Sequence, residues 1–254
     1  MLLLGPTCTD YDAGIAVDVE ILHHFGQRTD EIPEVNVADG PRRFTTDLGY
    51  EVELQRAYLA IERFQLVECA PGAGAGSAGA AARRALWPRG LALAHDLSGD
   101  PTVLGVPYID SALRADFALG DVGTMAPPPG RYCQVRVTIG PADTDALGMP
   151  DDIDMVGLSL YLEGSYRAPG ATRASHFIIE SSEERQALID LVDVYQGRPT
   201  PLVLDGDHRD IRLTLAGLTN FWLDGIDFAG EGLPEEEQGA LDAIAGTLHH
   251  HPGL

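Results

Sequence analysis

The sequence predicts a mainly β protein, a two-sheet antiparallel β-sandwich with one or two peripheral helices. Residues 46–69 and 130–139 alternate apolar and polar side chains with a period of two, which is typical of half-buried strands. Many short segments follow one another in this way and few helical patterns occur, which favours two packed sheets. A chain of 254 residues with 44% hydrophobic content is long enough to bury a sizeable core.

The alternation is clearer in residues 130–139 than in residues 46–69. In residues 46–69 the alternation is clean until Gln55 and Arg56 interrupt it, and it then resumes as far as Cys69. A helix is the alternative there, because several apolar residues also fall near helical spacing. The β-branched and aromatic residues favour strands. In residues 130–139 the alternation places Cys133 on the apolar face and Tyr132 on the polar one.

The other strands and turns follow in chain order. The first strand, residues 14–22, ends at His23-His24, and a loop follows it. Asp205-Gly206 favours a hairpin turn, and the aromatic-rich residues 220–228 are expected to form a strand or a turn. The remaining segments predicted as strands are residues 102–109, 115–119, 156–163, 176–180, and the hairpin pair 202–204 and 211–215.

Two helices are predicted. Ser181 and Glu184 have the spacing of a capping box, an apolar stripe follows as far as Tyr195, and Gly197 stands at the C-cap position. The second helix, residues 234–248, begins at a proline followed by three glutamates, which suit the positive end of the helix dipole.

One domain accounts for residues 14–254. Residues 71–82 are a Gly/Ala-rich, low-complexity insertion that cannot bury enough surface to order itself. Residues 1–13 are interpreted as a possible remnant of a lipoprotein signal or tether. The apolar run MLLLG precedes Cys8, the position at which a lipoprotein is acylated. A secreted protein without lipid and a cytosolic protein are the open alternatives.

The charge narrows the range of partners. The formal net charge is −22, and all 17 basic residues are arginines. Such a surface argues against nucleic acid and anionic membranes, which require basic patches. Contact with a membrane is therefore expected only through the lipid anchor.

The three cysteines suggest one pairing. Cys69 ends one predicted strand and Cys133 lies within another, so a disulfide is geometrically reasonable if the strands are neighbours. Two free thiols are the alternative. With Cys8 acylated, a disulfide would account for all three cysteines.

Histidines provide the candidate metal ligands, since neutral imidazole is the commonest metal ligand and suits copper or zinc. His95 is expected in a loop, with His23 or His24 as its helper, although these two point to opposite faces if the strand continues. Ordinary surface histidines are the alternative, and the terminal residues 249–251 are expected to form a mobile tail. Clustered aspartates, as at residues 151–154, are read as turns rather than calcium sites.

Three segments, residues 49–59, 128–133 and 222–228, resemble a group of bacterial secreted or lipid-anchored β-sandwich proteins of unknown function. The group is distantly similar to periplasmic partner proteins of the methanobactin type, which are tied to copper. The resemblance implies an exported module in the periplasm or at the cell surface that handles a metal or another small ligand.

The sequence contains no strong catalytic signature, so we expect a non-enzymatic, lipid-anchored, ligand-binding protein. The alternative is a structural or docking module that binds an unidentified protein of a cell-envelope complex.

Overall fold

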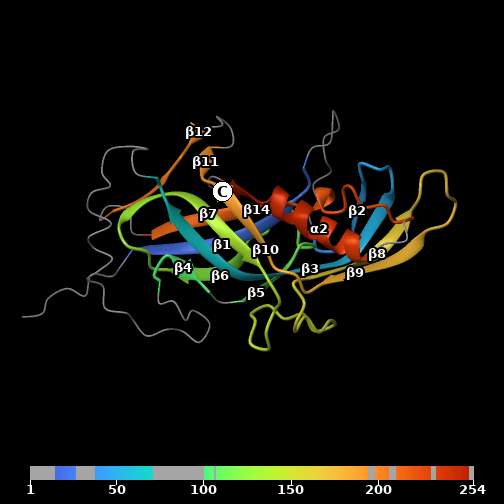
Figure 1. Cartoon of the computed structure of the whole chain (residues 1–254), viewed down its shortest axis with the longest axis horizontal. Coiled ribbons are helices and arrows are strands. Elements are labelled where there is room, and N and C mark those ends of the chain that lie inside the picture. The colour runs from blue at the N-terminus through green and yellow to red at the C-terminus, as the bar shows by residue number, and fades with distance from the viewer. Residues whose placement is uncertain are drawn as a thin grey trace, which may run out of the picture.

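The computed structural model describes residues 15–26, 38–70, 100–105, 107–193, 198–205, 210–229 and 233–251. The fold is mainly β, with two sheets packed around a common core and a helix against them, so the predicted sandwich-like class is confirmed (Figure 1). The predicted segments 1–13 and 71–82, Cys8 and His95 lie outside the described residues.

The smaller sheet has four strands in the order β15 (His249–His251), β14 (Asp210–Leu218), β1 (Ala16–His24) and β6 (Gly120–Met125). β1 runs parallel to β14 and antiparallel to β6, while β15 runs antiparallel to β14. The sandwich is therefore mixed rather than wholly antiparallel. The parallel pair is possible because β1 and β14 lie far apart in sequence, which leaves ample chain for the crossover that parallel strands require.

The larger sheet is built around β3 (Glu51–Glu68). Its main order is β10 (Arg185–Asp190), β7 (Gly130–Ile139), β3, β8 (Leu160–Arg167) and β9 (Ser175–Ser181). Four shorter strands extend it: β13 (Leu202–Leu204) pairs with β7, and β2 (Arg42–Thr45), β4 (Val103–Leu104) and β5 (Tyr108–Ser111) pair with β3. A separate two-stranded ribbon joins β11 (Val192–Asp193) and β12 (Arg198–Pro199).

β3 is one long strand whose buried side changes twice. Its register shifts between Leu54 and Arg56 against β8, and between Ile61 and Arg63 against β7. Each β-bulge adds a residue and moves the inward positions from even to odd numbers or back. The interruption seen in the sequence at residues 55 and 56 is therefore the first bulge. The residues of β3 that are buried in the main core are Val52, Leu54, Ala57, Leu59, Ile61, Phe64 and Leu66.

The predicted disulfide is confirmed. Cys69 follows the end of β3 and Cys133 lies on the neighbouring β7, with their Cα atoms 4.8 Å apart. A third shift of register, between Val67 and Glu68, occurs beside them. This bulge explains one wrong assignment: Tyr132 is fully buried and Cys133 only partly, the reverse of the faces that strict alternation predicted.

The helix α2 (Leu233–Thr247) matches the predicted C-terminal helix and packs against β9, β10 and β14. Its described inner residues, Ala240, Leu241 and Ile244, are fully buried and join the main core. The core also takes residues from both sheets, which makes the sheets and the helix one packed unit.

Other local predictions were also wrong. The predicted helix after Ser181 is strand β10, in which Ala187 and Ile189 are buried and Leu188 is 54% exposed, so pairing with β7 overrides the helical spacing. Residues 202–204 and 211–215 do not form a hairpin, because β13 joins the larger sheet and β14 the smaller. Residues 115–119 form a turn rather than a strand, and residues 249–251 form β15 rather than a tail.

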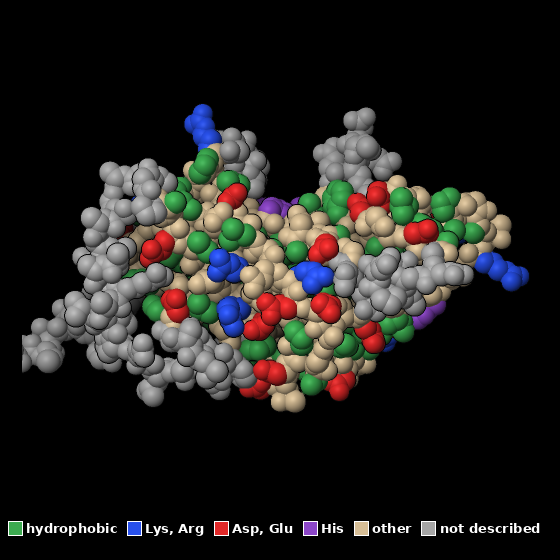
Figure 2. Space-filling view, viewed as in Figure 1, with side chains coloured by type: hydrophobic (Ala, Val, Ile, Leu, Met, Phe, Trp, Pro, Cys, Tyr) green, Lys and Arg blue, Asp and Glu red, His purple; other side chains and the backbone are tan. Residues whose placement is uncertain are grey.

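In the part of the chain that the structure describes, no helix has the length and apolar character needed to cross a membrane. On the face in Figure 2, acidic side chains are spread among uncharged ones and basic side chains are few. The charge of this protein is thus distributed over that face rather than gathered in one patch.

Candidate metal centre

Three histidines share the outer face of the smaller sheet. Residues that pair across neighbouring strands place their side chains on the same face. Leu22 of β1 pairs with Ala216 of β14, which pairs in turn with His249 of β15. His24 and His251 lie two residues from Leu22 and His249 on their own strands, so all three histidines point away from the main core.

Two of these histidines approach each other across β14. Their rings, those of His24 and His249, approach edge to face with centroids 5.9 Å apart and an interplanar angle of 82°. His251 is the next residue on the same face of β15, which gives a His-x-His pair on one strand. The strand pairing thus gathers imidazoles that are more than 220 positions apart in the sequence.

The ring nitrogens have defined partners. Nδ1 of His24 lies 3.1 Å from the carbonyl oxygen of Phe25, and Nδ1 of His249 lies 3.1 Å from that of Thr247. A carbonyl oxygen only accepts hydrogen bonds, so each Nδ1 carries a proton, and in the neutral ring Nε2 is the nitrogen with the lone pair. This arrangement fixes a metal-ligating histidine in the correct tautomer.

Two nitrogens of the cluster are buried without a hydrogen-bond partner among the described residues: Nε2 of His24 and Nδ1 of His251. A buried polar atom without a partner costs free energy, and such atoms in a folded protein point to a strained or functional position.

Burial lowers the pKa of two of these rings, those of His24 and His251. It lowers the pKa of His24; the Phe25 carbonyl opposes this effect, and His249 and His251 add to it. Burial lowers the pKa of His251 as well, and its neighbouring histidines lower it further. In His24 and His251 these shifts favour neutral imidazole, the form that binds metals.

The cluster is not a finished coordination sphere. Within the described ranges, no three His, Cys, Asp or Glu side chains are already placed to hold one ion. Metal–nitrogen bonds of about 2.0–2.1 Å put the centroids of two imidazoles on one ion roughly 5 Å apart. The centroids of the His24 and His249 rings, 5.9 Å apart, lie somewhat farther from each other than that.

His23 belongs to a buried hydrogen-bond network rather than to the histidine cluster. It faces the interior and is 3% exposed, and its Nε2 donates a hydrogen bond to the fully buried Asp110 of β5. The other carboxylate oxygen of Asp110 accepts from Arg114, whose second amino group lies 3.2 Å from the hydroxyl of Tyr108. The His23 ring also meets Trp222 edge-on, with centroids 5.3 Å apart. Because β1 and β5 belong to different sheets, this network ties the sheets together.

The histidines expected from the sequence to bind a metal therefore do not all lie in this cluster. His23 and His24 point to opposite faces, as expected, and only His24 is near other histidines. His95 lies outside the described residues. Sequence reasoning missed His249 and His251 because they were assigned to a tail; their period-two spacing directly after a helix was the available signal.

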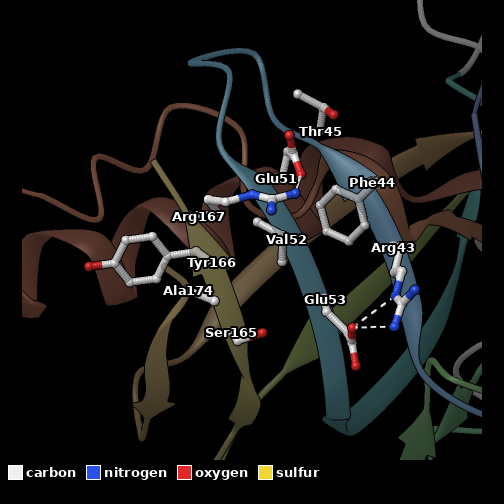
Figure 3. Close-up of a pocket in the computed structure, with 10 residues that line it drawn as sticks. All are labelled: Arg43, Phe44, Thr45, Glu51, Val52, Glu53, Ser165, Tyr166, Arg167 and Ala174. Atoms are coloured by element: carbon white, nitrogen blue, oxygen red, sulfur yellow. Dashed lines mark hydrogen bonds and ion pairs between the residues drawn. The ribbon is translucent and has the colours of Figure 1, made fainter. Parts of the chain in front are cut away.

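A second candidate is the groove over β2, β3 and β8, with a volume of about 530 Å³ (Figure 3). Arg43 pairs with Glu53 at 2.7 Å, and Arg167 pairs with Glu51. Both guanidinium groups are thus already engaged by carboxylates. The groove therefore offers a less distinctive chemistry than the histidines.

Comparison with known proteins gave no match: no family model, no curated protein and no solved structure is significantly similar to this chain.

Proposed function

We propose that this chain is a non-enzymatic β-sandwich that binds a divalent transition metal, copper or zinc, through His24, His249 and His251. The observation that carries the proposal is the edge-to-face pair of imidazoles, His24 and His249, each with Nδ1 held by a backbone carbonyl. Both Nε2 atoms are left as donors to a metal, and nitrogen donors of this kind suit both ions.

The position of His251 adds a third donor. It shares a strand face with His249, and its buried Nδ1 has no hydrogen-bond partner in the described part of the chain. Metal binding would supply that partner. The proposed centre thus has three imidazoles and an open position, which suits uptake and release of an ion.

We further propose that the protein works in an oxidising compartment, the periplasm or the cell surface. The Cys69–Cys133 disulfide supports this location, because structural disulfides persist outside the reducing cytosol. Lipidation at Cys8 would then anchor the domain to the membrane.

Isothermal titration with Zn²⁺ and with Cu²⁺ tests the proposal. We expect one ion per wild-type chain. Removing a group that only hydrogen-bonds to a metal ligand lowers metal affinity by about 10–100-fold. Removing a ligand itself should cost more, so His24→Ala and His249→Ala are each expected to lower the affinity by more than about 100-fold.

The matched control is His250→Ala. His250 lies between His249 and His251 but pairs with the core residue Leu215, and its Nδ1 lies 3.1 Å from the carbonyl oxygen of Val192. We expect this variant to bind like the wild type. A His95→Ala variant tests the sequence expectation separately. A metal-free wild type that co-purifies with another protein would instead favour the docking module.

A further inference from the structure

Phe117 has an unusual backbone. Among the described residues other than glycine, it is the one with a positive φ, 65°. This left-handed conformation brings Cβ close to the backbone, and bulky side chains rarely adopt it. Phe117 as a whole is also 40% exposed, so burial does not explain the conformation. Strained residues of this kind cluster at ligand sites, where the surrounding structure holds them in place.

The ring of Phe117 lies flat against one histidine of the proposed centre. The centroids of Phe117 and His24 are 5.0 Å apart, and the rings are nearly parallel, at 14°. The backbone N–H of Phe117 donates to the carbonyl oxygen of His23, 3.2 Å away, which fixes the loop to β1 at this point. The Phe25 carbonyl holds one edge of the imidazole and Phe117 holds its face.

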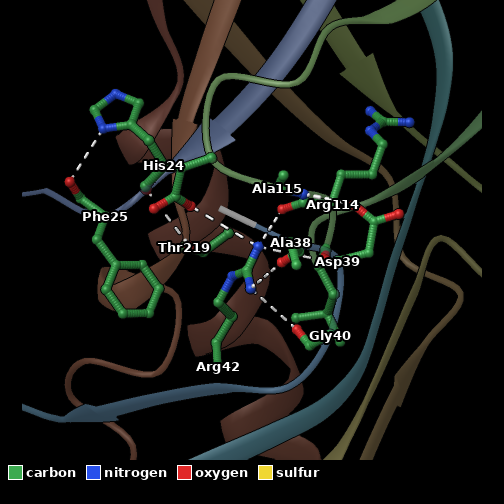
Figure 4. Close-up of polar contacts among 11 residues, drawn as sticks. His24, Phe25, Ala38, Asp39, Gly40, Arg42, Arg114, Ala115 and Thr219 are labelled. Atoms are coloured by element: carbon green, nitrogen blue, oxygen red, sulfur yellow. Dashed lines mark hydrogen bonds and ion pairs between the residues drawn. The ribbon is translucent and has the colours of Figure 1, made fainter. Parts of the chain in front are cut away.

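A buried arginine holds the loop that carries Phe117. Arg42, 2% exposed, donates to the carbonyl oxygens of Leu113 and Arg114, and its guanidinium lies 3.9 Å from Asp116. Figure 4 shows the Arg42 guanidinium pointing towards both Gly40 and Arg114, to whose carbonyl oxygens it donates. In addition, Ala115 N–H donates to the carboxylate of Asp39 at 2.8 Å. The residues just before Phe117 are therefore tied at several points, which is what a strained conformation requires.

We propose that Phe117 is a positioning residue of the metal centre: its ring fixes the plane of the His24 imidazole so that Nε2 faces His249. This inference rests on the proposed function. The strained backbone of Phe117 would then serve to orient the His24 ring before the metal binds. Groups that contact a metal-ligating histidine set the orientation of its ring and its affinity for the metal.

Two variants test it. Phe117→Gly removes the ring but fits the left-handed backbone, so the fold should be at least as heat-stable as the wild type. Its affinity for Zn²⁺ is nevertheless expected to fall 10–100-fold. Phe117→Tyr keeps an aromatic ring and should bind Zn²⁺ like the wild type. Val203→Ala, which removes an exposed apolar side chain from β13 in the larger sheet, is the control.

A second readout needs no metal. In NMR spectra of the metal-free protein, the stacked ring should shift the His24 ring protons upfield, and Phe117→Gly should abolish that shift while Phe117→Tyr keeps it. If the wild type binds Zn²⁺ and Phe117→Gly binds it equally tightly, this inference is overturned and the proposed function stands. A wild type that binds no Zn²⁺ or Cu²⁺ would overturn both.

Discussion

Removing the Cys69–Cys133 disulfide should destabilise the protein by a calculable amount. The bridge spans a sequence separation of 64 residues. In the chain-entropy model, opening a loop of that length costs about 4 kcal/mol at room temperature. Both cysteines are only partly buried, so replacing them with serine leaves no large cavity to add to the loss. The expected change in the free energy of unfolding is therefore the loop term.

The assay is guanidinium unfolding of the wild type and of the Cys69→Ser/Cys133→Ser double variant, followed by circular dichroism. The midpoint should fall, and the melting temperature should drop by roughly 8–16 °C for a chain of this size. The wild type in reductant should match the double variant, while Cys8→Ser should match the oxidised wild type. A loss below about 1 kcal/mol would refute the reasoning, because the loop term alone exceeds it.

Three further predictions concern other buried or paired groups. Asp110→Asn should cost about 3–5 kcal/mol of unfolding free energy, measured with denaturant, because the Arg114 guanidinium loses its buried carboxylate partner and the His23 ring N–H loses a charged acceptor. Burial and then the hydrogen bond to Glu163 raise the pKa of Tyr161 to about 12. The contribution of Tyr161 to stability should therefore be complete below about pH 10 and lost as the pH rises towards 12. An ultraviolet titration of the wild type against Tyr161→Phe measures this pKa. Arg42→Met should cost about 3 kcal/mol or more in thermal or denaturant unfolding, because several buried carbonyl oxygens lose a charged donor.

The strands with strict alternation could be predicted because one of their faces is buried. The interruption at residues 55 and 56 was visible in the sequence and corresponds to a bulge in β3. The bulge near Cys133 was not visible, because Tyr132 and Cys133 are both compatible with either face. Local pattern therefore gave the strands but not every inward position.

The errors arose where local spacing and tertiary pairing disagree. Leu188 and Leu191 have helical spacing, yet the neighbouring β7 offers hydrogen bonds along its whole edge, and β10 pairs with it. The Asp205-Gly206 turn signal was sound for a hairpin, but the strands on either side of it enter different sheets. No local signal reports which sheet a strand will join.

The candidate site was even less accessible from the sequence. The sequence indicated His24 as a candidate metal ligand, but its neighbour His249 lies near the other end of the chain. The parallel pairing of β1 with β14 brings them together, and parallel partners cannot be identified from a single sequence. The partner of His23, Asp110, is likewise 87 positions away.

The most direct test of the central claim is the position of a bound ion. Crystals of the full chain grown with Zn²⁺ would be measured at the zinc absorption edge to give an anomalous difference map. We predict one strong peak between the rings of His24 and His249, about 2.0–2.1 Å from the Nε2 atom of each. A peak elsewhere, or no peak in protein shown to be saturated with Zn²⁺, would contradict the proposed metal centre.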